Sequence, residues 1–222
     1  MSYDIDDVTV LVAGKPAPSM AQLAKGTPSL DLPRDPERLG ALCSRCCLRR
    51  CAGPVFWSGP LDAELAVVGE APGWDEVDVK IPFVGASGRL LDRVLSELNY
   101  PRSKVLVVNV LLHMPSGGNL EDYVTLKRRE AKADGLPFED PTDLCRPALF
   151  RILGIPACQR CERYKLGPDR CACKQPSWVW LGEARTPPKV IISVGNAALW
   201  SLYGVRGITR WRGSPINMGG VV

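Results

Sequence analysis

Polar residues follow two apolar runs at the points where a strand would end. Gly69-Glu70-Ala71-Pro72-Gly73 comes directly after one run, and Asn109 ends the other. Glu70 is a carboxylate that could orient a water molecule or stabilise positive charge developing on a reacting carbon. The Asn109 carboxamide offers both a donor and an acceptor, and backbone N–H groups of the turn at Gly73 could contact the same ligand or a phosphate. Together these residues favour a site for a planar polar ring, although singly a helix cap and a turn residue would explain them.

An aromatic residue lies between these two segments in a turn of its own. Phe83 stands in Pro82-Phe83-Val84-Gly85, and its ring could form the platform against which a flat ligand stacks. A place in the ordinary core is the alternative for this residue. The three segments together carry the residue types needed to bind a flat ring and to act on a bond beside it.

The order and spacing of these motifs resemble those of the family-4 uracil-DNA glycosylases and their phage-type relatives, which carry an iron–sulfur cluster. GEAPG at 69–73, PFVGASGRLLD at 82–92 and a strand ending in Asn109, with a CxxC upstream, carry the resemblance, which runs from about Cys43 to Gly213. It implies a protein that flips uracil out of DNA and hydrolyses its N-glycosidic bond. In that interpretation Glu70 is catalytic, and the residues around the base are Gly69, Ala71, Pro72, Gly73, Phe83 and Asn109.

Cysteines are frequent and histidine is nearly absent. Nine cysteines and one histidine, in a chain whose N-terminal segment is acidic where a secretory signal would be basic, favour metal ligation over disulfides. The resemblance implies a [4Fe–4S] cluster held by Cys43, Cys46 and Cys145, with His113 at the position where most members have cysteine. Imidazole can replace thiolate as a ligand of cluster iron. A core of reduced cysteines without a cluster is the alternative.

The remaining cysteines leave two questions open. Cys47 or Cys51 could take the place of His113 as the fourth cluster ligand. Further along the chain, four thiols in one short segment have spacing similar to a zinc knuckle, and they could hold a structural Zn²⁺ or form a loose reduced loop. These four are Cys158, Cys161, Cys171 and Cys173.

Two basic segments are candidates for contact with nucleic acid. Arg206, Arg210 and Arg212 surround Trp211, a pattern that suits single-stranded or flipped nucleic acid but also a surface loop with the indole packed inward. Lys127-Arg128-Arg129-Glu130 is either a solvated helix face or a phosphate contact. It lies where a uracil-crosslinking branch of the superfamily carries a nucleophilic histidine, and it contains none. We therefore predict hydrolysis or no chemistry, and not covalent capture.

The elements that must position these residues alternate between strands and helices. Apolar runs at 65–68, 105–108 and 190–194 are typical of buried parallel strands, while 90–98 and the segment from Ala197 have helical spacing. Asp35-Pro36 predicts a short helix before the first cysteines, and a further helix is expected over 142–153. This order predicts a three-layer α/β/α domain with a short parallel central sheet, whose ligand crevice lies at the carboxyl ends of the strands.

The predicted domain organisation is simple. Residues 1–35 are expected to form an irregular N-terminal extension and residues 36–222 the glycosylase-like domain, with inserts at 116–141 and 154–188. The family continues through a final strand to a His-Pro-Ser/Thr segment whose histidine stabilises the uracil anion, whereas this sequence ends at Val222. We therefore expect a domain cut short at its C-terminus, with a rate lower by a factor of about 10²–10³ for want of that stabiliser.

Composition is consistent with this interpretation. A net charge of +4 permits nucleic-acid binding without requiring it, and no apolar run is long enough to span a bilayer. The expectation is a cytoplasmic monomer whose partner is uracil-containing DNA. Two alternatives remain open, namely a non-catalytic nucleic-acid-binding member of the superfamily and a metal or redox protein that uses its cysteines directly.

Overall fold

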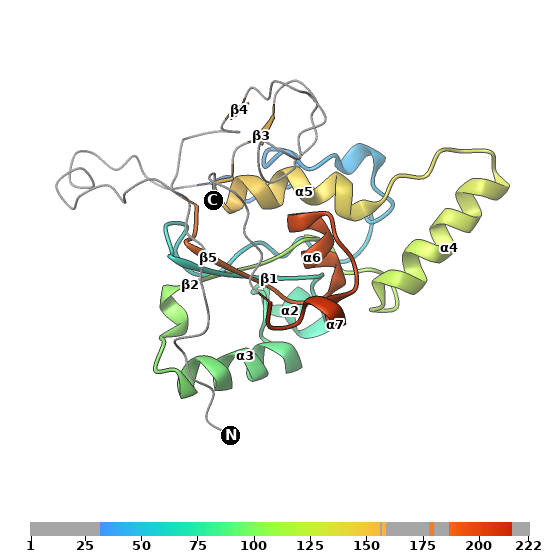
Figure 1. The fold of residues 1–222 in the computed structure, drawn as a ribbon. Helices are drawn as coiled ribbons and strands as arrows, with labels where there is room; N and C mark the ends of the chain where they lie inside the picture. The colour runs from blue at the N-terminus through green and yellow to red at the C-terminus, as the bar shows by residue number, and fades with distance from the viewer. Residues whose placement is uncertain (1–31, 156, 159–177, 180–186, 215–222) are drawn as a thin grey trace.

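The computed structural model describes residues 32–155, 157–158, 178–179 and 187–214 (Figure 1). Its short 3-10 helices are η2 (Cys43–Arg45) and η3 (Arg102–Lys104). The α-helices are α2 (Trp74–Val79), α3 (Ala86–Glu97), α4 (Leu120–Ala133), α5 (Pro141–Ile152), α6 (Asn196–Tyr203) and α7 (Ile208–Trp211). The strands are β1 (Leu65–Gly69), β2 (Val105–Asn109), β3 (Ala157–Cys158), β4 (Trp178–Val179) and β5 (Val190–Ser193).

The central sheet is parallel and has the order β2-β1-β5, so the chain winds outward from β1 in both directions. Gly69 pairs with Asn109 across β1 and β2, and Val68 pairs with Ser193 across β1 and β5. The three strands therefore end at the same edge of the sheet. The predicted ligand crevice lies at that edge, where Glu70 and Gly195 follow their strands.

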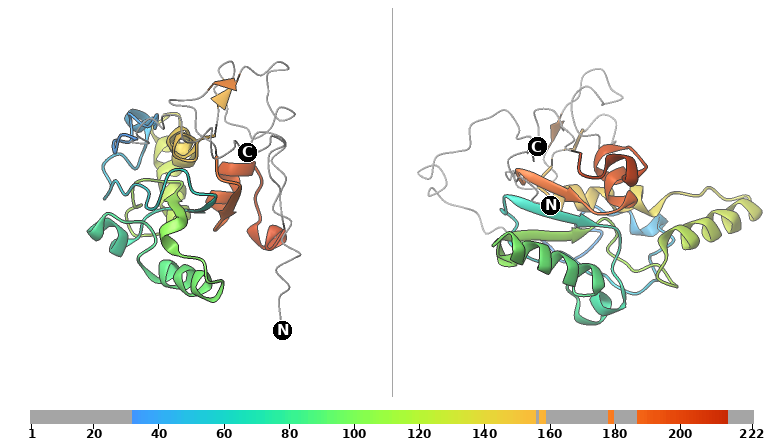
Figure 2. Two further views of the ribbon diagram at one scale, coloured as in Figure 1. Left: turned by 90° about the vertical axis from the view of Figure 1, so that its left-hand side faces the viewer. Right: turned by 60° about the horizontal axis from the view of Figure 1, so that its bottom comes forward.

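Alternate residues of β1 face two separate cores, which gives the three predicted layers. Ala66 and Val68 belong to the larger core, formed with α5 and α6, whereas Val67 belongs to a smaller core with α3. Figures 1 and 2 show α5 and α6 on one side of the sheet and α3 on the other. The α/β fold class expected from the sequence is confirmed.

The third strand differs from its prediction as a buried strand. All five residues of β2 are buried, but Ile192 in β5 is 45% exposed. The smaller core contains residues of β1, β2 and α3 and none of β5. Within the described part of the chain α3 packs under β1 and β2, so one face of β5 is without the cover that an apolar run normally indicates.

The helical pattern at 90–98 correctly predicted α3, but only part of its apolar surface is buried. Leu95 is buried and Leu91 packs against the smaller core. Leu90 and Val94 are exposed. The spacing of the apolar residues therefore located the helix, but it did not specify how much of the apolar face of α3 is buried.

The predicted helix at Asp35-Pro36 is a single turn. Asp35 Oδ1 accepts a hydrogen bond from the Arg38 N–H at 2.8 Å, as an N-cap would, but Gly40 has a φ of 102° and the turn does not continue. By contrast, α5 begins one residue earlier than predicted. Asp140 caps it by accepting from the Thr142 N–H at 3.0 Å, and Pro141 occupies the first turn.

The two predicted inserts contain regular structure. The first holds α4, which Figures 1 and 2 show extending away from the sheet. The second holds the antiparallel pair of β3 and β4. The boundaries proposed for the extension and the domain remain predictions. No helix in the described part of the chain is both long and apolar enough to cross a bilayer.

Candidate active site

Two of the predicted site residues meet over Gly69. A Cβ atom on Gly69 would lie within 3.0 Å of Asn109 Oδ1 and 2.5 Å from Phe83 Cε2. The carboxamide and the aromatic ring therefore converge at the carboxyl end of β1, where only a residue without a side chain leaves room for both. Asn109 is 3% exposed and Phe83 is 7% exposed, so the pair is buried at the end of the sheet.

The turn that carries Phe83 is held from several sides. Phe83 has a φ of 57°, a left-handed conformation that is uncommon outside glycine. Arg102 Nη2 donates to the carbonyl oxygens of Phe83 at 2.9 Å and Pro82 at 3.1 Å, while Arg102 Nη1 pairs with Asp92 at 2.6 Å. A Cβ on Gly88 would overlap the Phe83 carbonyl. The orientation of the ring is thus determined by its backbone and not only by side-chain packing.

Glu70 lies at the wall of a cleft of about 600 Å³. Its side chain is exposed within the cleft, and the surrounding walls raise its pKa by desolvation, with the charge of Glu121 adding to the increase. The Glu70 carbonyl accepts from the Leu111 N–H at 3.0 Å, and the Gly69 carbonyl accepts from the Val110 N–H at 2.9 Å. These bonds continue the pairing of β1 with β2 and keep Glu70 beside Asn109.

The cleft does not include every predicted residue. Phe83 and Asn109 lie outside its lining, so the structure gathers a buried pair next to an exposed carboxylate. Ala71 is half-buried, Pro72 is buried and Gly73 precedes α2. The predicted base-contacting segment is therefore a short loop that joins β1 to α2, and its Ala71 packs against the larger core.

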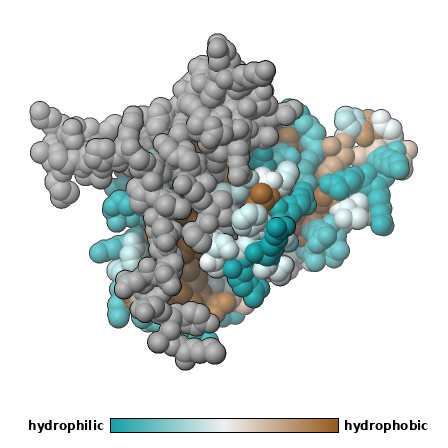
Figure 3. Space-filling view, in the orientation of Figure 1, coloured by the Kyte–Doolittle hydropathy of each residue, from teal (hydrophilic) through white to brown (hydrophobic). Residues whose placement is uncertain are grey.

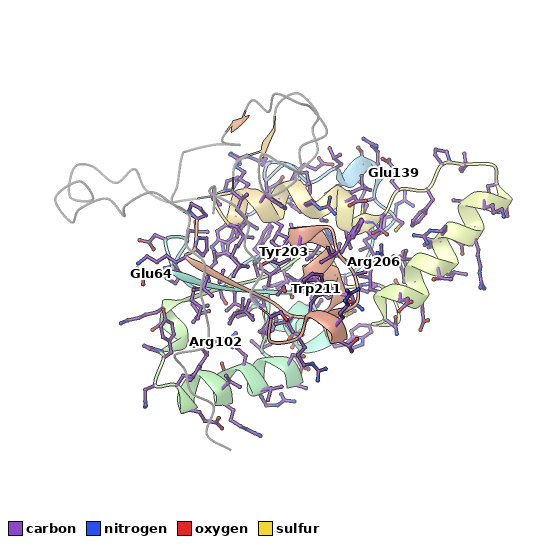
Figure 4. The ribbon with its side chains drawn as sticks, viewed as in Figure 1. Glu64, Arg102, Glu139, Tyr203, Arg206 and Trp211 are labelled. Carbon is purple, nitrogen blue, oxygen red and sulfur yellow. The ribbon has the colours of Figure 1, made fainter. Side chains whose placement is uncertain are left out.

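Arg206 is the one member of the predicted arginine trio that lines the cleft. Its guanidinium lies 4.7 Å from the ring centroid of Trp200, which also lines the cleft. Arg210 and Arg212 are exposed and lie outside that lining, while Trp211 is half-buried. Figure 4 shows Arg206 and Trp211 on the α6–α7 side of the molecule, where the described surface is mostly hydrophilic or neutral (Figure 3).

The charged segment at 127–130 lies on α4 and is largely paired with its own neighbours. Lys127 Nζ is 2.7 Å from Glu130 Oε2. Arg128 lies 5.2 Å from the Phe138 ring centroid and 3.6 Å from Asp140 Oδ2, and it also lines the cleft. This arrangement fits the solvated helix face for Lys127 and Glu130, and it leaves Arg128 at the cleft as a candidate phosphate contact.

Sequence reasoning missed several residues that shape the site. The Asn196 side chain accepts from the N–H groups of Gly207 at 3.2 Å and Ile208 at 2.8 Å, which fixes the loop that carries Arg206. Arg102 and Glu76 hold the Phe83 turn. The position of Glu76 could have been noticed in the sequence, because it stands three residues after Gly73, the N-cap of α2, which is the spacing of a capping box.

The predicted iron ligands lie near one another around Cys46. The thiols of Cys145 and Cys47 are hydrogen-bonded to Cys46 and lower its pKa to about 3. The Leu42 N–H donates to the Leu144 carbonyl at 3.0 Å, which brings η2 beside the start of α5. Burial lowers the pKa of His113, and the negative charge of Cys46 opposes that decrease. The four candidate donors Cys43, Cys46, His113 and Cys145 therefore form one neighbourhood.

These donors do not converge on a single ion. Within the described ranges, no three His, Cys, Asp or Glu side chains form a group that could hold one metal ion. A [4Fe–4S] cluster takes one protein ligand per iron, so its ligands surround a cube and need not meet at a point. The donor chemistry, three thiols and one imidazole near the N-terminal end of α5, therefore fits a cluster better than a mononuclear ion.

The other cysteines have different surroundings. The Cys51 thiol lies 3.4 Å from the Tyr123 hydroxyl and 3.5 Å from Ser116 Oγ, which directs it toward α4. The Cys47 thiol is hydrogen-bonded to Cys46, and Cys47 stays a candidate for the fourth ligand. Cys158 ends β3. Cys161, Cys171 and Cys173 lie outside the described residues, so the zinc site remains a prediction.

Comparison with known proteins places the chain in a family. The family model of the uracil DNA glycosylase superfamily matches residues 56–218. The type-4 uracil-DNA glycosylase of Pyrobaculum aerophilum is 32% identical over 114 residues, which cover 51% of this chain and 50% of the relative. Type-4 uracil-DNA glycosylases of Archaeoglobus fulgidus (40% over 74 residues; 33% of this chain, 37% of the relative) and Sulfurisphaera tokodaii (34% over 115 residues; 51% and 45%) are also similar.

The chain matches half or less of the length of each of these relatives. The family match, by contrast, includes Phe83, Asn109 and the glycine-rich segment around Glu70, and it extends over well more than half of the chain. The chain belongs to the uracil-DNA glycosylase superfamily.

Proposed function

We propose that this protein recognises uracil in DNA and hydrolyses the bond between the base and the sugar. The observation that carries the proposal is the convergence of the Asn109 carboxamide and the Phe83 ring over Gly69, with Glu70 beside them at the cleft. A flipped base needs a surface on which to stack and polar groups that read its edge. Relatives named type-4 uracil-DNA glycosylases support the same interpretation.

Each residue has a distinct role in this proposal. The Asn109 carboxamide would accept from uracil N3–H and donate to O4. The Phe83 ring would stack on the base, and its fixed turn would spare the cost of ordering it on binding. Glu70, ionised, would orient the attacking water and stabilise positive charge on the sugar. The raised pKa of Glu70 makes its carboxylate a better proton acceptor than an ordinary surface glutamate.

The reaction is a hydrolysis and needs no oxidant or reductant. The C1′–N1 bond breaks and its electron pair leaves with uracil as an anion at N1. The hydroxyl of water adds to C1′, and the remaining proton of that water ends on the uracil anion or in solvent. The products are the free base and an abasic site. Stabilising the sugar cation and the leaving anion are therefore the two electrostatic tasks of the site.

The DNA strand that carries the flipped uracil would lie along the cleft. Arg206 and Arg128 line it, and each could contact a backbone phosphate. Their partners, Trp200 and Asp140, hold both guanidinium groups at its wall. Exposed Arg210 and Arg212 would extend the basic surface beyond the cleft.

An iron–sulfur cluster fits the donor set near the N-terminal end of α5. Cys43, Cys46 and Cys145 would hold it with His113, and Cys47 is the alternative to His113. Such a group, when bound, would cross-link η2, α5 and the segment after β2. That would be a structural role. The alternative of a redox protein gains no support from the site or from the relatives.

The experiment is excision of uracil from a single-stranded oligonucleotide by anaerobically purified protein, followed by alkaline cleavage of the abasic site. Glu70→Ala should abolish cleavage, and Glu64→Ala, an exposed glutamate at the other end of β1, should not. If the wild-type protein binds the oligonucleotide and leaves the uracil in place, the chain is a non-catalytic binder and the proposed hydrolysis is wrong.

A further inference from the structure

We propose that Glu76 is a positioning residue that joins the two halves of the candidate site. Its carboxylate would hold the loop after β1 and the Phe83 turn at one fixed separation. The consequence for catalysis rests on the proposed function, whereas the mechanical role does not. Glu76 is absent from the residues that the sequence motifs single out, and it does not line the cleft.

Three backbone N–H groups donate to the Glu76 carboxylate. Oε2 accepts from Gly73 at 2.9 Å, and Oε1 accepts from Gly85 at 2.9 Å and from Val84 at 3.2 Å. The residue is only 9% exposed. A buried carboxylate must be satisfied by donors, and here all three come from the two segments that carry the site.

The glycines at both ends of this contact leave room for the carboxylate. A Cβ on Gly73 would lie 2.7 Å from Oε2, and a Cβ on Gly85 would lie 3.1 Å from Oε1. Neither glycine has a left-handed φ, so backbone conformation does not explain why glycine occupies these positions. Close approach to Glu76 does explain it, and it does so independently in two segments of the chain.

The position of these bonds determines what Glu76 controls. Gly73 ends the loop that begins with Glu70, and Val84 directly follows Phe83. Arg102 holds the same turn through the carbonyls of Pro82 and Phe83. The Glu76 carboxylate accepts from the two N–H groups that follow Phe83, and the Arg102 guanidinium donates to the carbonyl groups of Phe83 and of the residue before it. The separation of Glu70 from the Phe83 ring is therefore set by a carboxylate that touches neither.

The first test needs no variant. Hydrogen exchange followed by NMR should show the amides of Gly73, Val84 and Gly85 protected in the wild-type protein, since each donates to a buried carboxylate. Exchange of all three at the rates of unprotected loop amides would overturn the proposal. This exchange measurement tests the mechanical role of Glu76 even if the protein excises no uracil.

The second test compares Glu76→Gln with Asp78→Asn, which removes the same charge from an exposed position of α2. The glutamine keeps the shape but presents an NH₂ group to at least one N–H donor. Exchange at Gly73, or at Val84 and Gly85, should rise by roughly 10- to 100-fold, the worth of a hydrogen bond to a charged group. Amides of β1 and β2 should keep their wild-type rates. Equal acceleration everywhere would mean a merely structural role and would refute the proposal.

Excision kinetics give the functional arm. If the wild-type chain cleaves uracil, Glu76→Gln should lower kcat by at least tenfold, while Asp78→Asn should match wild type. Glu76→Asp, which keeps the charge but shortens the reach, should restore protection on one side only and recover part of the rate. An unchanged kcat in a variant whose three amides have lost protection would show that the separation does not matter for the chemistry.

Discussion

Replacing Gly69 with alanine should disable the site while leaving the fold intact. The new Cβ would lie 2.5 Å from Phe83 Cε2 and closer still to Asn109 Oδ1, against 3.4 Å or more for an ordinary contact. One or both side chains must therefore retreat by roughly 1 Å. A displacement of that size at a reacting centre can cost about 100-fold in rate. We expect a loss of about that size in uracil excision.

The same overlap should cost stability. Overpacking of a buried site typically costs about 1–3 kcal/mol, and each kcal/mol lowers Tm by about 2–4 °C in a chain of this size. A drop of that order would not unfold the protein at 25 °C. Activity and stability should therefore separate.

A stability-matched control tests that separation. Val105 is fully buried at the opposite end of β2, four residues before Asn109 and thus about 13 Å away along the strand. Val105→Ala removes two methyl groups and should cost roughly 2 kcal/mol. Thermal unfolding and excision are measured on both variants. If Gly69→Ala keeps wild-type activity, or if Val105→Ala with the same Tm loses as much, the convergence over Gly69 is not what organises the site.

Three further predictions concern charge, metal and nucleic acid. Because Glu121 raises the pKa of Glu70, Glu121→Gln should lower it and move the acidic limb of the pH–rate profile to lower pH; a shift to higher pH would contradict this. Cys145→Ser should lose most of the iron bound after anaerobic purification, whereas Cys51→Ser, directed toward α4, should keep it, as iron analysis and visible absorption would record. Arg206→Ala should weaken single-stranded DNA binding for all sequences and reduce the slope of log K against log salt by about one, and an unchanged slope would place Arg206 away from phosphate.

Local patterns in the sequence predicted most of the fold. The runs at 65–68 and 105–108 became β1 and β2 because four consecutive apolar residues before a polar one suit a strand covered on both faces. The helix expected over 142–153 is α5, which begins one residue earlier because Asp140 and Pro141 fix its first turn. The exposure of Ile192 could not be predicted this way, since it depends on where α3 packs and not on the residues of β5.

The site was predictable only in part, for a similar reason. Glu70, Phe83 and Asn109 have chemistry that a motif can reveal. Nothing in the local sequence says that Phe83 and Asn109 are buried together while Glu70 faces a cleft. That arrangement depends on the register of β1 against β2, which is a property of two segments that lie forty residues apart.

The residues that arrange the site have little chemistry of their own. Gly69 contributes only the space in which a ring and a carboxamide can meet, and Gly88 contributes only room for the Phe83 carbonyl. Glu76 and Arg102 act on backbone groups that every residue possesses. A variant that keeps Glu70, Phe83 and Asn109 but alters these four would retain the recognisable motif and lose the geometry. We therefore expect the activity of variants to depend on these four supporting residues as well as on the three motif residues.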